Sequence, residues 1–142
     1  MSEDVLETAV VERRIAAPPS RVFELLSSGE NWLRWQGVSA EMDVAPGGHL
    51  AVDIMGDGVV ACGRFEEVVP GERLVFTWGW DAPGHPVPPG SSRVEIELRP
   101  DGEGTLLRLT HTVGAETWGA KVEGGWAHHL DRLSAVAGEG AA

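Results

Sequence analysis

An alternating run of large apolar residues in the segment from Gly63 to Trp80 constrains the fold more than any other feature of this sequence. Pro70 and Gly71 are typical of a tight turn, so the segment predicts two antiparallel strands. In the second strand, every second residue is large and apolar: Leu74, Phe76, Trp78 and Trp80. Because strand side chains alternate between faces, all four project from one side of a sheet. This aromatic face either packs against a helix or lines a pocket for an apolar ligand.

Length and charge narrow the class of protein. The 142 residues favour a single domain, with flexible tails at about 1–7 and 137–142. A formal charge of −11 repels phosphate backbones and anionic lipids, so it disfavours nucleic-acid and membrane partners. No apolar stretch approaches the roughly 20 residues that cross a bilayer. Cys62 is the only cysteine and the first residues do not resemble a signal peptide, which predicts a cytoplasmic protein.

The first third of the chain predicts one strand and two short helices. The strand runs from Thr8 to Ile15, where apolar residues are frequent. Two prolines then suit the first turn of a helix whose apolar stripe ends at Ser27–Gly29. Residues 31–37 form a second short helix or turn, in which Trp32 and Trp35 lie three residues apart and share one side.

The remainder predicts six strands and one long helix. Period-two alternation near residues 50–55 and 94–99, with turn residues between the strands, indicates an antiparallel meander. The proline-rich segment from Asp81 to Gly90 predicts an exposed loop between the fifth and sixth strands. A helix is expected from Glu116 to Val136, because apolar residues recur every three or four positions at Trp118, Val122, Trp126, Leu130 and Leu133. The chain therefore predicts an α+β fold in which a curved antiparallel sheet of six to seven strands surrounds a long carboxy-terminal helix.

Five motifs carry a resemblance to a known family. They are residues 31–37 (NWLRWQG), 46–50 (PGGHL), 63–78, 104–111 (GTLLRLTH), and Gly125-Trp126 with the LDRL of residues 130–133. In this order they resemble the bacterial activator of Hsp90 ATPase homologue 1-like family of the START/Bet v 1-like superfamily, also called SRPBCC. The resemblance implies a helix-grip fold with a hydrophobic cavity between sheet and helix, a cavity that the superfamily uses for lipids, sterols, plant hormones and polyketides. The eukaryotic activator has a separate amino-terminal domain, but only about eight residues precede the first strand predicted here, so co-chaperone activity is not implied.

Eight residues are expected to contact a ligand in such a cavity. They occupy inward positions on the sheet, the bent helix pair or the long helix. The set is Trp35, Phe65, Phe76, Trp78, Trp80, His111, Trp126 and His129. The alternative is that the aromatic members only fill the core, because the chain has three phenylalanines and no tyrosine to do so.

Two histidines are the polar members of this set. His111 lies in period-two register with Leu107 and Leu109, so it faces inward. A ligand, a water molecule or the carboxy-terminal helix would supply the partner that a buried imidazole needs. A structural role is favoured, because isolated core histidines are commoner than catalytic ones. His129 follows Trp126 by three residues and joins the buried stripe of the helix.

No pattern indicates a metal, another cofactor or a catalytic centre. His128 and His129 are adjacent, whereas helical metal ligands lie three or four residues apart. Cys62 has no activating base nearby in the sequence. Glu95 and Glu97 alternate with apolar residues and are expected on a solvated outer face, which does not favour paired-carboxylate catalysis.

Three functions are compatible with these features. Noncatalytic binding of a small hydrophobic molecule is favoured. The alternative is an enzyme of the polyketide cyclase or aromatase type, in which His111 or His129 moves protons. A protein-interaction or co-chaperone-like module that uses the acidic surface is the second alternative. The sequence leaves the ligand, any reaction and the oligomeric state open.

Overall fold

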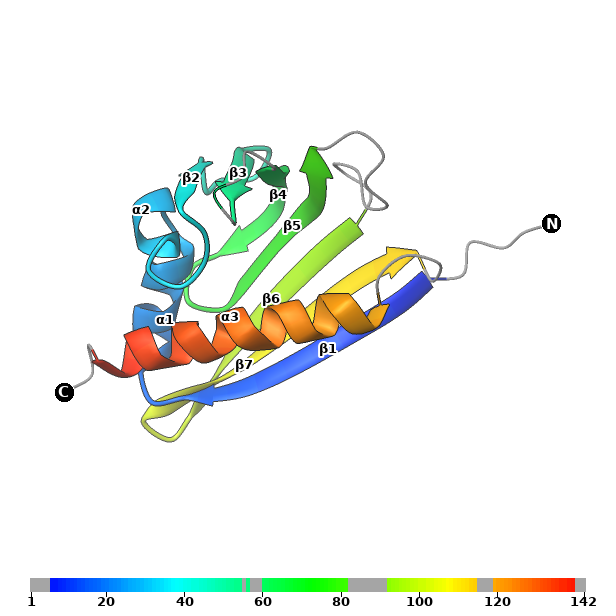
Figure 1. The fold of residues 1–142 in the computed structure, drawn as a ribbon. Helices are drawn as coiled ribbons and strands as arrows, with labels where there is room; N and C mark the ends of the chain where they lie inside the picture. The colour runs from blue at the N-terminus through cyan, green and yellow to red at the C-terminus, as the bar shows by residue number, and fades with distance from the viewer. Residues whose placement is uncertain (1–5, 55, 57–59, 82–91, 115–118, 140–142) are drawn as a thin grey trace.

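One antiparallel sheet and a long helix dominate the structure, a computed structural model that describes residues 6–54, 56, 60–81, 92–114 and 119–139 (Figure 1). The sheet has seven strands in the order β1-β7-β6-β5-β4-β3-β2. Every neighbouring pair is antiparallel. The chain order of one strand, two short helices, six strands and a long helix is as predicted, and the α+β helix-grip fold is confirmed.

The elements have the following bounds. The strands are β1 (Leu6–Ile15), β2 (Ser39–Met42), β3 (His49–Asp53), β4 (Val60–Val69), β5 (Arg73–Asp81), β6 (Ser92–Asp101) and β7 (Gly104–Gly114). The helices are α1 (Pro19–Leu26), α2 (Gly29–Trp32) and α3 (Gly119–Glu139).

Helix α3 extends further than the sequence predicted. It ends at Glu139, three residues after the expected Val136. Ala137 is fully buried and continues the apolar stripe of Leu130 and Leu133 by one more turn, which explains the longer helix. Most of the predicted proline-rich loop, together with Trp118 and residues 1–5 and 140–142 of the predicted tails, lies outside the described residues.

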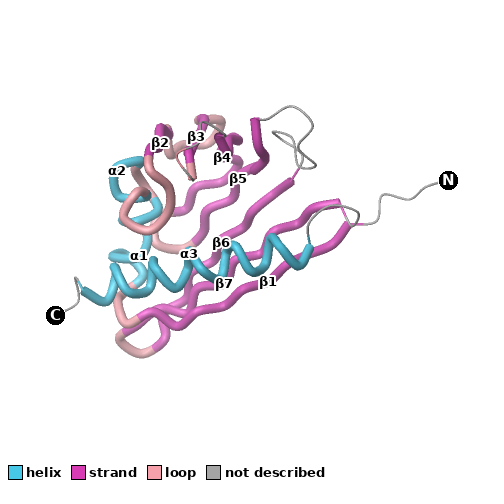
Figure 2. The backbone as a smooth tube through the Cα atoms, in the orientation of Figure 1, coloured by secondary structure: helices cyan, strands magenta, loops and turns pink. Residues whose placement is uncertain are grey.

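The hairpin of β4 and β5 confirms the turn predicted at Pro70-Gly71. The amide of Glu72 donates to the carbonyl of Val69 at 2.9 Å, and Gly71 has a φ of 77°. This left-handed conformation suits glycine, which has no β-carbon to clash with the following carbonyl. The turn places β4 and β5 side by side in the half of the sheet that ends with β2 (Figure 2).

A bulge in β4 decides which glutamates reach the outer face. Phe65 lies opposite Phe76, but Glu67 lies opposite Val75, so Glu66 is an extra residue in the strand. The glutamate side chains at both positions are exposed, instead of one pointing inward. The sequence pattern alone did not indicate this bulge.

Apolar side chains on the inner face form the core. Leu74, Phe76 and Trp78 are 0–4% exposed, as their alternation predicted. The two short helices close one end of this core, where the indole N–H of Trp35 donates to the Leu25 carbonyl at 2.9 Å. Within the described residues, no helix combines the length and the apolar character that crossing a bilayer requires.

Candidate functional site

Helix α3 covers only part of the concave face. Its backbone packs against β1, β7 and α1 (Figure 1). Arg13 of β1 fixes this side of the helix, because its Nε donates to Asp131 at 2.7 Å. Between α3 and β5 the contact is made by aromatic side chains, and the rings of Trp78 and Trp126 lie 5.3 Å apart. The helix therefore lies along one side of the curved sheet.

A continuous series of aromatic contacts crosses the interior. It begins at α2, where Trp32 meets Phe76 with ring centroids 5.9 Å apart. Phe76 contacts Trp78 at 5.8 Å, and Trp78 contacts both Trp80 at 6.4 Å and Trp126 on α3. Most of these contacts are edge-to-face or tilted, the geometry that aromatic quadrupoles favour. The alternation in β5 thus produces a continuous aromatic wall.

Beside this wall, several inward apolar side chains remain partly exposed. Those that pack against the core in this way are Ala40, Met42, Val44, Ile54, Val68, Trp80, Ala127 and Val136. Six of the eight belong to β2–β5 or to the segments that connect these strands. The inner side of this half-sheet is therefore apolar and is covered completely at residues such as Leu50 and Phe76, but only partly at these six.

His111 lies at the centre of a chain of buried hydrogen bonds. The Nε1–H of Trp126 donates to His111 Nδ1 at 2.9 Å. On the other side of the ring, His111 Nε2 lies 2.7 Å from Ser92 Oγ, and the Ser92 hydroxyl also contacts the Trp78 carbonyl. Of the three partners that the sequence allowed for His111, the structure therefore supplies the carboxy-terminal helix.

The direction of every bond in this chain is determined. An indole nitrogen can only donate, so Nδ1 of His111 must be the acceptor and, in the neutral ring, Nε2 carries the proton. Nε2–H then donates to Ser92, and Ser92 donates to the Trp78 carbonyl. This is the reverse of a catalytic Ser-His pair, in which the imidazole takes the serine proton. Burial lowers the pKa of His111 from 6.5 to about 4, so the ring is neutral near pH 7.

His129 lies on the other side of α3 from Asp131. The two residues are separated by about 200° around a helix of 3.6 residues per turn, and Asp131 faces β1. His129 instead meets the backbone carbonyl of Trp35, which follows α2. Its Nδ1 is buried and has no hydrogen-bond partner in the described part of the chain. Burial is the main cause that lowers the pKa of His129.

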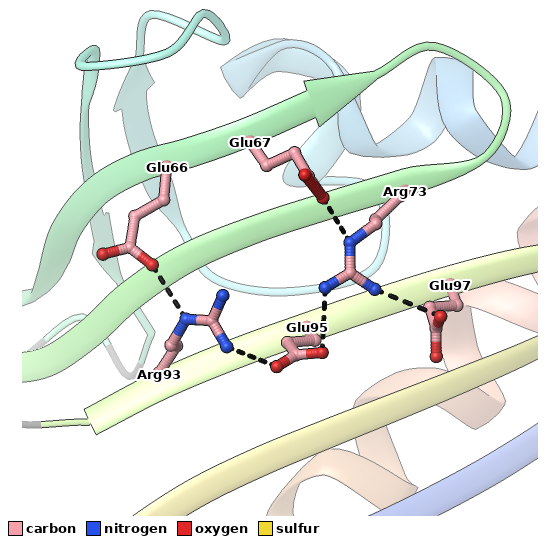
Figure 3. A network of polar contacts seen from close by, with 6 residues as sticks. All are labelled: Glu66, Glu67, Arg73, Arg93, Glu95 and Glu97. Atoms are coloured by element: carbon pink, nitrogen blue, oxygen red, sulfur yellow. Dashed lines mark hydrogen bonds and ion pairs between the residues drawn. The ribbon is translucent and has the colours of Figure 1, made fainter.

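The outer face of the sheet carries a network of charged residues (Figure 3). Arg73 contacts Glu67 and also donates to Glu95 and Glu97, both at 3.1 Å. Arg93 donates to Glu66 at 2.8 Å and also contacts Glu95. The expectation that Glu95 and Glu97 lie on the outer face is correct, but they are paired with arginine and partly buried. Each of the four glutamates in the network therefore contacts one or both of the two arginines.

A shallow groove lies on the same outer face, lined by Glu12, Glu97, Arg99, Leu106 and Arg108. Its volume of about 40 Å³ accommodates a few atoms, which is too small for a lipid-sized ligand. No group of three or more metal-binding side chains occurs in the described ranges. His49 and His128 are exposed, and His85 lies outside the described residues.

The eight predicted ligand contacts differ in burial. Six are 0–4% exposed: Trp35, Phe65, Phe76, Trp78, His111 and Trp126. Trp80 and His129 are half-buried. Contact of any of the eight with a ligand stays a prediction. Sequence reasoning overlooked Ser92, although it precedes Val94 and Ile96 at inward positions of β6 and the same alternation would have placed it.

Comparisons with known proteins agree with this architecture. The family described as Activator of Hsp90 ATPase homolog 1-like protein matches residues 16–138. The AHSA1-like protein RHE_CH02687 from Rhizobium etli is 44% identical, with 97% of this chain and 87% of that chain covered and a TM-score of 0.74. No functionally curated protein sequence matches the chain.

Two further solved structures are similar. CalU16 from Micromonospora echinospora is 27% identical, with 93% of this chain and 81% of that chain covered and a TM-score of 0.72. DynU16, a protein in the dynemicin biosynthetic locus, is 23% identical with a TM-score of 0.77. The likeness covers 94% of this chain but 46% of DynU16, and it shows a shared fold.

Proposed function

Because this chain belongs to the activator of Hsp90 ATPase homolog 1-like family, and because half of its concave face is apolar yet incompletely covered, we propose that it binds a small hydrophobic molecule without catalysis. The ligand lies between the inner side of β2–β5 and α3. The observation that carries the proposal is the partial exposure of inward residues such as Met42, Ile54 and Trp80. A ligand that covers these side chains gains about 25 cal/mol of binding free energy for every Å² of apolar surface that it removes from water.

The polar chemistry of the interior supports binding over catalysis. His111 is one of the two histidines that an enzyme would use, and both of its ring nitrogens are engaged. Its proton lies towards Ser92, so it cannot act as a base for that hydroxyl. A single cysteine and an acidic surface are consistent with our further proposal of a cytoplasmic location.

Filling the proposed space tests this function. Val136 is half-buried on α3, packs against the core and lies seven residues after His129 on the same side of the helix, so Val136→Trp is expected to occupy ligand space and weaken binding of an apolar probe at least tenfold. Ala135 is exposed on the same helix, so Ala135→Trp adds the same group where no ligand binds and serves as the matched control. Thermal unfolding confirms that both variants are folded, and Val136→Leu provides a smaller obstruction.

Isothermal titration calorimetry with 2-methoxynaphthalene measures the binding. Loss of binding in Val136→Trp but not in Ala135→Trp would support the site. Equal binding by both folded variants, or no binding by the native protein, would contradict it. Native mass spectrometry of the protein purified from its own host would then identify a retained ligand.

A further inference from the structure

One buried polar atom near the proposed ligand space has no partner. His129 Nδ1 lacks a hydrogen bond to any described residue, although it is shielded from solvent. The Trp35 carbonyl can only accept, so Nε2 of His129 carries the ring proton and Nδ1 is an acceptor. A buried acceptor without a donor costs roughly 1–3 kcal/mol, and native structures rarely leave such groups unpaired. The position therefore needs an explanation.

Most buried donors of the described interior already have partners. The buried donors with partners include Trp32 Nε1 with Gln36, Trp35 Nε1 with Leu25, Trp126 Nε1 with His111, His111 Nε2 with Ser92, Ser92 Oγ with Trp78 and Thr105 Oγ1 with Ala17. None of these donors is available to His129. The Nε of Arg21 on α1 is the other buried atom without a partner among the described residues, and it makes no hydrogen bond to His129. A bound molecule can supply the donor that these side chains do not.

The position of His129 on the helix indicates that source. Arg13 holds the Asp131 side of α3 against β1, and His129 projects about 200° away from it. That direction leads to Trp35, which follows α2, and α2 itself packs on β2. His129 thus lies on the side of α3 that faces the incompletely covered half-sheet, where the proposed ligand binds.

We propose that His129 Nδ1 accepts a hydrogen bond from a hydroxyl or N–H group of the bound molecule. The ligand is then an uncharged, largely apolar compound with one hydrogen-bond donor. This inference rests on the proposed function, which it extends by assigning the ligand class. Carboxylate ligands fit poorly, because a neutral Nδ1 presents a lone pair and the protein carries a formal charge of −11.

Matched ligands and matched variants test the inference. 2-Naphthol carries the donor, 2-methoxynaphthalene lacks it, and 2-naphthoate replaces it with a charge. His129→Asn retains a hydrogen-bond acceptor bonded to Cγ, the atom to which Nδ1 of histidine is also bonded. His129→Leu removes the acceptor but has a similar volume. By calorimetry, we expect the native protein to prefer 2-naphthol over 2-methoxynaphthalene by about tenfold, the effect of one hydrogen bond. The preference is expected to persist in His129→Asn and to vanish in His129→Leu, and 2-naphthoate is expected to bind more weakly than 2-naphthol.

The outcomes separate this inference from the proposed function. Equal affinity of the native protein for the two neutral ligands, or a preference that survives in His129→Leu, would overturn the role of His129 and leave the binding site intact. Failure of both neutral ligands to bind the native protein would overturn the binding function and this inference together. A second measurement does not depend on the variants: the ¹⁵N resonance of His129 Nδ1 should shift with 2-naphthol, and an unchanged resonance would also refute the assignment. His111 serves as the internal control, because its nitrogens are already paired.

Discussion

Protonation of His111 should destabilise the fold over a defined pH range. Its pKa is lowered from 6.5 to about 4 by burial, and its Nδ1 faces the N–H of Trp126, so a proton on Nδ1 would bring two donors together. Between these two values the unfolded chain binds a proton that the native protein does not, so stability falls as the pH falls. The contribution is complete above about pH 6.5 and is lost progressively down to about pH 4. The shift corresponds to about 3 kcal/mol.

Urea unfolding from about pH 7.5 to about pH 4 measures this effect by comparison with His111→Gln, which keeps a polar side chain but cannot titrate. Carboxylates and His129 titrate in both proteins, so the difference between the two stability curves isolates His111. The native protein is expected to be the more stable at neutral pH, and its advantage should shrink by about 3 kcal/mol on acidification. Parallel curves would show that His111 is not held neutral by its surroundings. An NMR titration in which the ring protonates near its ordinary pKa would refute the reasoning directly.

Three further substitutions test other parts of the structure by urea unfolding. Trp126→Phe keeps an aromatic ring but leaves His111 Nδ1 without its donor, so the free energy of unfolding is expected to fall by about 1–3 kcal/mol. The fall should be smaller in a His111→Gln background, and equal falls in both backgrounds would contradict the bond. Arg73→Gln removes the arginine shared by three glutamates, so the free energy of unfolding is expected to fall by about 1 kcal/mol, and by less in about 1 M salt. A fall that does not depend on salt would indicate that Arg73 stabilises the fold by packing instead of by charge. Gly63→Ala places a β-carbon 1.8 Å from a carbonyl of β5 and should cost roughly 3 kcal/mol or more. Gly71→Ala, at a turn with open space, should cost only about 1 kcal/mol, and similar costs at both glycines would be inconsistent with the strand spacing.

Local patterns determined the elements and their faces. The alternation of β5 predicted which side chains are inward, and the predicted turn has the expected left-handed glycine. The stripe of α3 likewise identified Trp126 and Leu130 as buried. These properties follow from the two-residue period of a strand and the 3.6-residue period of a helix, which depend only on neighbouring residues. The inward direction of His111 was predictable for the same reason.

Relations between distant segments required the tertiary structure. Ser92, His111 and Trp126 come from three different elements, and their bonds depend on strand register and on the position of α3. The bulge at Glu66 changed which glutamates reach the outer face, although no local signal marked it.

The partners of the two histidines show the same division. Sequence periodicity gave both an inward position, but only packing decided that His111 has both ring nitrogens engaged while His129 keeps one unpaired. The sequence by itself thus determined the fold class and the apolar concave face. Tertiary structure decided which part of that face α3 covers, because the placement of a helix on a sheet depends on side chains that are far apart in the chain and must fit together as a whole.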